Sequence, residues 1–305
     1  MKKTKSADPY ILEIGQTNFP INPKDLSKYM AKIKRPESPI IIFFGNTKYS
    51  IIGAKIIHSV FPFTLFVTKS IDNPVKDLSL NLKIPYLEFD KLDEKAVAEI
   101  KDFEPDFLIV EDYGLIMPQS LLDIPKIAPI NIHHSLLPKY RGASPAPFVI
   151  LKGEKESGVT VMKMVLEVDA GDILAQEKYT LAENETTDSL RTKLNHTGGN
   201  LAVKVIEQFL DGTISPIKQD HSQASFTKRF KKEDGFFDIN NPPAPEILDR
   251  MIRAYYPWPG VWTKWNGKII KFYPNNMVQM EGKKVISLKD FLNGYPTFPL
   301  KILSS

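Results

Sequence analysis

Cysteine is absent from the 305-residue sequence. The chain therefore has no disulfide, no thiolate metal site and no cysteine nucleophile, and it is compatible with a reducing compartment. Long apolar runs are absent too, since PIIIFFG at residues 39–45 is far shorter than the roughly 20 residues that span a bilayer. The basic N-terminus lacks the apolar segment of a secretory signal. We expect a cytoplasmic protein that does not enter a membrane.

A strong charge of one sign is also lacking, because the net charge is only +4. The charge is unevenly distributed: residues 1–38 carry +4, residues 39–225 carry −6 and residues 226–305 carry +6. A basic terminal module suits a polyanionic partner such as a nucleic acid. Lysine-rich surfaces also simply keep proteins in solution, so the charge alone leaves both interpretations open.

Short apolar runs alternate with helical patterns over the first half of the chain. The runs predict strands at residues 38–45, 63–68, 84–89, 105–112 and 128–134. This alternation indicates βαβ units, and therefore an α/β fold with a doubly wound, mostly parallel, Rossmann-like sheet. The first βα turn, FFGNTKYS, is neither GxGxxG nor a P-loop, so the usual dinucleotide and nucleotide signatures are missing. A ligand is still expected near the carboxyl ends of the strands.

The alternation continues beyond residue 142. A helix with a proline in its first turn ends at Gly153, and two strands are expected at 158–165 and 173–181. A long helix follows at 186–212, with Gly198-Gly199 inside it as a point of close packing.

Four segments are expected along the chain. Residues 1–38 form an N-terminal extension, and residues 39–212 form the α/β domain. Residues 213–225 are polar and are interpreted as a linker. Residues 226–305 are rich in proline and tryptophan, with short strand-like pieces and Asn-Gly turns, and they predict a small β-rich domain.

The segment NIHH, residues 131–134, lies at the end of the expected fifth strand. Because side chains alternate along a strand, Asn131 and His133 share a face about 6.6 Å apart, and His134 points the other way. An amide and an imidazole on one face could stabilise an oxyanion. They could equally satisfy buried backbone groups. A carboxylate partner is available in LEVDAGDIL, where Asp169 and Asp172 flank Ala-Gly in an expected turn.

Together these residues resemble a known family. Asn131-Ile-His133, the following SLLP and RG, and Asp169-Ala-Gly 38 residues after the asparagine resemble the formyltetrahydrofolate-dependent formyltransferases. The resemblance covers roughly residues 39–212, and it implies that Asn131, His133 and Asp169 are catalytic. It also implies 10-formyltetrahydrofolate as the formyl donor and no metal.

The resemblance extends to binding residues. The formyl-donor site would comprise residues of YGLI and SLLP, namely Tyr113, Gly114, Leu115, Ile116, Ser135, Leu136, Leu137 and Pro138. The acceptor substrate would contact Arg141, Gly142, Lys228 and Arg229. For Arg141, a role in ordering the loop is an equal alternative. The tryptophans of YPWPGVWTKW could stack on nucleotides or form the core of the small domain.

The C-terminal region indicates which molecule accepts the formyl group. RMIRAYYPWPGVWTKWNGK at 250–268 and SLKDFLNGY near the end resemble the second, OB-like domain of methionyl-tRNA formyltransferases. The implied function is formyl transfer to the amino group of initiator methionyl-tRNA by a monomeric enzyme. An amino sugar nucleotide, or another small amine, is the alternative acceptor.

Two departures from the family concern RNA binding. The family usually carries a long basic insertion after the second strand, whereas residues 67–79 are short and only mildly basic. The OB-like domain is also shortened by about 40 residues relative to that resemblance. Neither departure touches the formyl chemistry.

Overall fold

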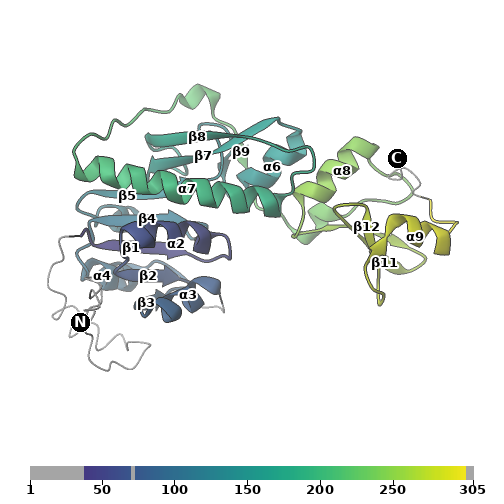
Figure 1. Ribbon diagram of the computed structural model, residues 1–305, viewed down its shortest axis with the longest axis horizontal. Helices are drawn as coiled ribbons and strands as arrows, with labels where there is room; N and C mark the ends of the chain where they lie inside the picture. The colour runs from purple at the N-terminus through teal and green to yellow at the C-terminus, as the bar shows by residue number, and fades with distance from the viewer. Residues whose placement is uncertain (1–37, 70–72, 300–305) are drawn as a thin grey trace, which may run out of the picture.

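The computed structural model of the chain describes residues 38–69 and 73–299. All but the last residue of the expected N-terminal extension, 1–38, lies outside this part. Three sheets are present: a large one near the N-terminus of the described chain, a small one near its C-terminus (Figure 1), and a two-stranded one that pairs residues 141–142 with residues 226–227. No helix in the described ranges is long and apolar enough to cross a membrane.

The large sheet has seven strands in the order β3-β2-β1-β4-β5-β7-β8. The first five strands of this order run parallel, and β7 and β8 are antiparallel to their neighbours. The strands are β1 (Ile41–Gly45), β2 (Leu65–Thr68), β3 (Tyr86–Glu88), β4 (Phe107–Glu111), β5 (Ala128–His133), β7 (Glu156–Lys163) and β8 (Ile173–Thr180). Strands β1 and β4 are buried along their whole length, as expected for central strands covered on both faces. The expected mostly parallel α/β fold is confirmed.

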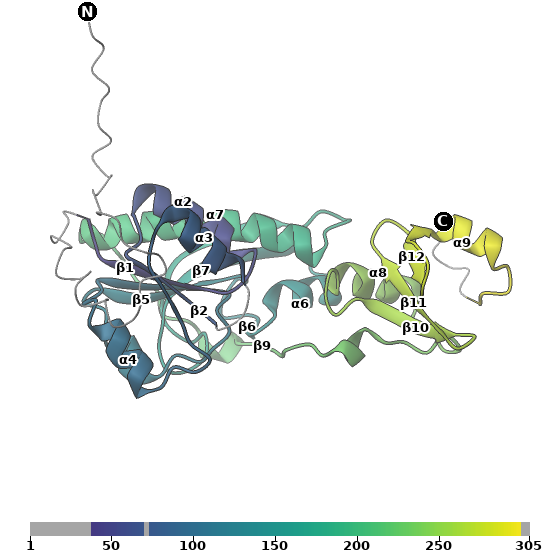
Figure 2. The same ribbon diagram turned by 90° about the horizontal axis from the view of Figure 1, so that it is seen from below.

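Helices cover both faces of this sheet (Figure 2). The first face carries α2 (Ser50–Val60), α3 (Pro74–Leu82) and α7 (Thr187–Leu210), and the second carries α4 (Glu94–Lys101) and α5 (Gln119–Leu122). Local sequence explains where helices begin: the Asn73 side chain accepts hydrogen bonds from the first turn of α3, and Thr186 caps α7.

Helix α7 runs unbroken through Gly198-Gly199. A Cβ atom on Gly199 would lie 2.9 Å from the Cα atom of Gly53, so only glycine allows α7 and α2 to approach this closely. The expected role of this glycine pair in close packing agrees with that contact.

The small sheet is antiparallel, in the order β10-β11-β12-β13. Its strands are β10 (Val261–Trp265), β11 (Lys268–Tyr273), β12 (Met277–Met280) and β13 (Ile286–Ser287), and it packs with α8 (Pro245–Ala254) and α9 (Leu288–Gly294). A two-residue turn with positive φ at Asn266 and Gly267 joins β10 to β11, as the Asn-Gly signal predicts. The outer edge of β10 is covered, because the backbone nitrogen of Phe237 donates to the Trp262 carbonyl.

The core of the small sheet includes residues from two helices of the large-sheet part of the chain. Leu190 and Leu194 of α7, together with Ile150 of α6 (Pro145–Lys152), pack into the same buried cluster as Leu248 of α8 and Phe272 of β11. The Thr187 hydroxyl also donates to the Ala254 carbonyl at 2.5 Å. The small sheet is therefore held firmly against one end of α6 and α7.

The three tryptophans have different surroundings, and one of them has the core role considered for the cluster. Trp265 packs edge-on against Tyr295 and Phe298 in the core of the small domain, whereas Trp258 is 59% exposed. Trp262 lies between these extremes: its ring contacts Phe236, and its indole N–H donates to the Lys232 carbonyl.

Candidate active site

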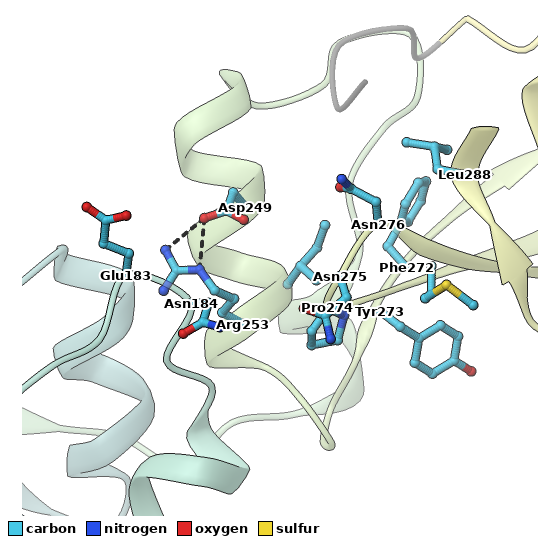
Figure 3. Close-up of a pocket in the computed structure, with 12 residues that line it drawn as sticks. Glu183, Asn184, Asp249, Arg253, Phe272, Tyr273, Pro274, Asn275, Asn276 and Leu288 are labelled. Carbon is cyan, nitrogen blue, oxygen red and sulfur yellow. Dashed lines mark hydrogen bonds and ion pairs between the residues drawn. The ribbon is translucent and has the colours of Figure 1, made fainter. Parts of the chain in front are cut away.

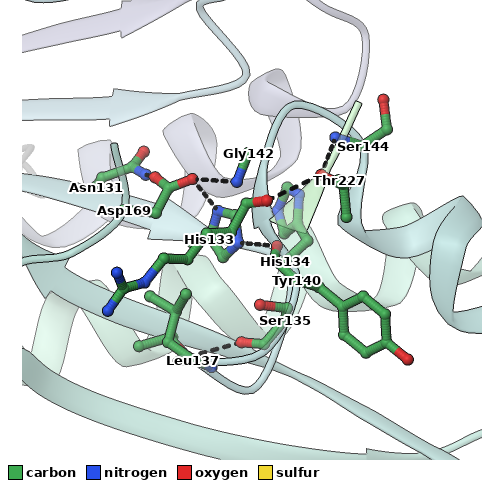
Figure 4. Close-up of polar contacts among 12 residues, drawn as sticks. Asn131, His133, His134, Ser135, Leu137, Tyr140, Gly142, Ser144, Asp169 and Thr227 are labelled. Atoms are coloured by element: carbon green, nitrogen blue, oxygen red, sulfur yellow. Dashed lines mark hydrogen bonds and ion pairs between the residues drawn. The ribbon is translucent and has the colours of Figure 1, made fainter. Parts of the chain in front are cut away.

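The end of β5 brings the three residues expected to be catalytic together (Figure 4). The Asn131 amide nitrogen lies 3.4 Å from Oδ1 of Asp169, and Nδ1 of His133 lies 3.6 Å from Oδ2 of the same carboxylate. His134 points to the opposite face of the sheet, as strand alternation predicts. One carboxylate therefore contacts both the amide and the imidazole.

The position of Asp169 is fixed by its turn. Its backbone is left-handed, with φ of 51°, and its Oδ2 accepts a hydrogen bond from the Gly142 backbone nitrogen at 2.7 Å. The Gln219 side chain donates to the Asp169 carbonyl at 2.9 Å and to the Gly171 carbonyl at 2.7 Å. Asp172, the other carboxylate in this turn, makes no described contact with Asn131 or His133.

The second nitrogen of the His133 ring, Nε2, lies 3.0 Å from the Tyr140 carbonyl oxygen. Because a carbonyl oxygen only accepts, this contact places a proton on Nε2. The Nδ1 to Asp169 distance of 3.6 Å is too long for a hydrogen bond, and the two groups form an ion pair only when the imidazole carries a second proton. The imidazole is thus oriented by a backbone carbonyl on one side and faces a carboxylate on the other.

Only glycine fits the backbone conformation and the space at position 142. It has a φ of 104°, and a Cβ atom there would lie 2.8 Å from the Thr227 carbonyl oxygen. Arg141 and Gly142 form β6 (Arg141–Gly142), which pairs in parallel with β9 (Phe226–Thr227). The loop between β5 and α6 is therefore hydrogen-bonded to the segment that leads into the small domain.

Arg141 is only 1% exposed. Its guanidinium donates to the Gln219 side-chain oxygen at 2.8 and 3.2 Å and lies 3.2 Å from Nδ1 of His221, and its contact with Glu167 is 3.5 Å. This burial favours loop ordering over substrate contact, the two roles considered for Arg141.

The YGLI segment, expected to bind the formyl donor, follows β4. Tyr113 is buried edge-on against Phe44, and burial raises the pKa of its hydroxyl. Ile116 is 77% exposed, and Leu115 is half-buried. The Gly114 carbonyl accepts a hydrogen bond from Arg229 at 2.7 Å.

The SLLP segment lies between β5 and β6. Ser135 and Leu137 are buried and bonded within the protein, the Ser135 hydroxyl to the Lys139 carbonyl and the Leu137 nitrogen to the Thr160 hydroxyl. Leu136 and Pro138 are half-buried. The first pair shapes the loop, so only the second pair retains surface for a ligand.

The two basic residues expected to contact the acceptor have different surroundings. Lys228 is paired with Asp234 at 3.1 Å, whereas Arg229 bonds only the Gly114 carbonyl among the described residues. Arg229 thus joins the start of the C-terminal region to the loop after β4.

No sequence pattern predicted the cluster of buried ionisable side chains behind β5. Glu111 has no exposed surface, and its Oε1 lies 3.5 Å from Nε2 of His134. Burial raises the pKa of Glu111 well above its usual value and lowers that of His134 to about 4. Burial also acts to raise the pKa of Asp112, but Arg191, 2.6 Å away, and His134 lower it. Burial therefore favours the neutral form of both members of the Glu111–His134 pair.

Two cavities lie between the large-sheet part of the chain and the small domain. One has a volume of about 260 Å³ and is shown in Figure 3; the other has about 510 Å³. Both are lined by Glu183, Asp249, Arg253 and Asn276, and neither is lined by Asn131, His133 or Asp169. The described ranges contain no group of three or more His, Asp or Glu side chains placed to hold a metal ion.

Comparisons with known proteins identify the family of this chain. The formyl transferase model matches residues 61–206, and the model for the formyl transferase C-terminal domain matches residues 229–279. The methionyl-tRNA formyltransferase of Koribacter versatilis is 35% identical over 256 residues, which cover 73% of this chain and 81% of that protein. The chain belongs to the formyl transferase family. It is therefore a formyltransferase, and the expected family resemblance is confirmed.

Other relatives and solved structures extend the comparison. Several more methionyl-tRNA formyltransferases match over about 200 residues, which is slightly less than two thirds of their length. A sugar N-formyltransferase from Shewanella has the same fold at 19% identity, with a TM-score of 0.62 over 81% of this chain and 99% of its own. HypX from Aquifex aeolicus, solved with tetrahydrofolic acid, aligns at 16% identity with a TM-score of 0.60 over 84% of this chain and 47% of its own.

Proposed function

We propose that this formyltransferase moves the formyl group of 10-formyltetrahydrofolate to the amino group of methionyl-tRNA. The carboxylate of Asp169, held against both Asn131 and His133, carries the proposal for the chemistry. The curated relatives carry it for the acceptor. The net positive charge of residues 226–305 suits a phosphate-rich substrate.

The nucleophile comes from the substrate, so the protein needs no nucleophile of its own. The amine nitrogen attacks the formyl carbon, and negative charge grows on the formyl oxygen. Breaking the bond between that carbon and N10 then releases tetrahydrofolate. The proton lost by the amine balances the proton gained by N10.

We propose that the Asn131 amide donates a hydrogen bond to the formyl oxygen. One of the two amide N–H groups faces Asp169, and the other can make this bond. In this geometry the Nε2 proton of His133 is bonded to the Tyr140 carbonyl. The imidazole therefore acts chiefly next to Asp169, rather than as the direct partner of the oxyanion that the sequence suggested.

Asp169 is the proposed proton acceptor for the attacking amine, directly or through one water molecule. The carboxylate accepts from the Gly142 nitrogen, which fixes one oxygen, while Asn131 lies beside the other. General acid–base and oxyanion contributions of this kind are each worth about 10²- to 10⁴-fold in rate.

A formyl-transfer assay tests the proposal. The protein is incubated with 10-formyltetrahydrofolate and either charged initiator tRNA or a nucleotide-linked amino sugar. We expect formyl-methionyl-tRNA, with a KM that rises steeply with salt because several phosphates are neutralised on binding. Transfer to the amino sugar alone, with shallow salt dependence, would instead support the second acceptor class, which the fold of the Shewanella sugar N-formyltransferase keeps open.

A further inference from the structure

Two cations from distant parts of the chain meet at the loop after β4. Lys69 directly follows β2, and Arg229 lies at the start of the C-terminal region. A Cβ atom on Gly114 would lie 3.5 Å from Nζ of Lys69 and 3.9 Å from Nη2 of Arg229. Both cationic nitrogens therefore lie within 4 Å of one point at the carboxyl edge of the sheet.

Neither cation has an acidic partner within 4 Å in the part of the chain that the structure describes. Other basic residues in the same region do: Lys48 is paired with Asp188, and Lys228 with Asp234. Arg229 is exposed, and its one described hydrogen bond, to the Gly114 carbonyl, leaves most of its five N–H groups available. Two neighbouring like charges that no described carboxylate offsets repel each other, so an anion that bridges them would be stabilised.

We propose that Lys69 and Arg229 form a carboxylate-binding subsite for the glutamate of the folate formyl donor. This inference rests on the proposed function. The formyl group is on N10, between the pterin ring and the p-aminobenzoylglutamate. With the formyl group beside Asp169, the glutamate is the negatively charged end of the donor, and its carboxylates suit two cations at the surface.

The short loop of this chain is consistent with such a subsite. Lys69 stands at the base of the connection between β2 and α3, which is the place where the sequence lacks a long basic insertion. Its position at the end of β2 directs a single cation towards Gly114. Charge-assisted hydrogen bonds from Lys and Arg to a carboxylate are among the stronger polar contacts in proteins, so tight donor binding does not require an extended loop.

Direct binding of two ligands tests the subsite: tetrahydrofolate, and tetrahydropteroate, which lacks the glutamate. We expect the wild-type protein to bind tetrahydrofolate at least about 10-fold more tightly. Lys69→Met and Arg229→Met should each weaken tetrahydrofolate binding about 10-fold and change tetrahydropteroate binding less than about twofold. Arg229→Lys keeps the charge and should lose only part of the affinity.

Lys55→Met is the matched control, because Lys55 is an exposed lysine of α2, on the face of the sheet that α7 shares. It should bind both ligands as the wild type does. Equal losses for both ligands, or no loss for either, would overturn the subsite. So would variants with unchanged tetrahydrofolate affinity and a raised KM for the RNA, because the anion would then be an acceptor phosphate.

The binding measurement is independent of transfer. If the wild-type protein formylates no methionyl-tRNA and still binds tetrahydrofolate through its glutamate, the proposed acceptor is wrong and the subsite stands. If it formylates the RNA and the two ligands bind equally well, the subsite is wrong and the proposed function stands.

Discussion

At the scale of single residues, Asp169 is the group on which the proposed chemistry depends. Its left-handed backbone and the Gly142 N–H direct one carboxylate towards both Asn131 and His133. The side chain is therefore oriented before any substrate binds, which is what efficient proton transfer requires.

Asp169→Asn should lower kcat at least about 100-fold and change the KM of the formyl donor little, because the amide fills the same space but cannot take a proton. Steady-state kinetics with saturating acceptor measures both values. Asp172→Asn alters the other carboxylate of the same turn and should stay within about threefold of wild type. An Asp169→Asn enzyme within tenfold of wild type would contradict the assignment.

His134 makes the stability of the fold depend on pH. It is buried among Glu111, Asp112, Arg191 and the neighbouring His133, and burial lowers its pKa from 6.5 to about 4. As the pH falls from 6.5 to 4, the unfolded chain takes up a proton on this side chain and the folded chain does not. Its contribution to stability is thus complete above pH 6.5 and is lost on acidification, by up to about 3 kcal/mol.

We expect His134→Gln to lose less unfolding free energy than wild type between pH 7 and pH 4.5. Urea unfolding at the two pH values measures the difference. His196→Ala removes an exposed histidine of α7 and should follow the wild-type pH dependence. Parallel pH dependences for His134→Gln and wild type would show that the buried imidazole is not the sensitive group.

At the scale of secondary structure, the pattern of apolar residues and the positions of helix-ending residues predicted most of the large sheet. Apolar runs of five to eight residues identified β1, β2 and β4, and Gly153 marked the end of α6, where it is left-handed. The alternation rule separated His133 from His134 correctly. The pairing of Asp169 with Asn131 came from family resemblance, since no local pattern links residues 38 positions apart.

Other parts of the site were beyond the sequence. Gln219 bonds Arg141 across 78 residues, and Glu111 meets His134 only because β4 and β5 are neighbours. Strands β6 and β9 have two residues each, too few for any periodicity. These contacts depend on tertiary packing, which composition and spacing do not encode locally.

The contact between α2 and α7 gives a prediction at this scale. Gly199→Ala places a methyl group 2.9 Å from the Gly53 Cα atom, so the helices must separate, at a cost of about 1–3 kcal/mol. Thermal unfolding measures the loss. Gly294→Ala in α9 meets no atom within 4 Å and should be neutral or slightly stabilising. Equal melting temperatures for the two variants would contradict the close packing.

At the scale of the whole molecule, the core of the small sheet includes residues of α6 and α7, so we expect both parts of the chain to unfold as one cooperative unit. All three tryptophans lie in the small domain, so their fluorescence reports that domain, whereas the far-ultraviolet signal of the long helices reports mainly the large one. We expect the two unfolding curves to coincide.

Leu194→Ala provides the perturbation. Leu194 belongs to α7 and is completely buried in the core shared with the small domain, so its truncation should cost about 2–5 kcal/mol. Both curves should shift together. A shift of the helical signal with unchanged tryptophan fluorescence would show that the domains unfold separately.

The two-residue pairing of β6 with β9 has a mechanical consequence. The loop that supplies the Tyr140 carbonyl to His133 and the Gly142 nitrogen to Asp169 is paired with β9, in the segment that leads into the small domain. A macromolecule that displaced the small domain on binding would strain both hydrogen bonds at once. Binding of a distant acceptor and orientation of the reacting side chains are then coupled, through the four backbone residues of this pairing.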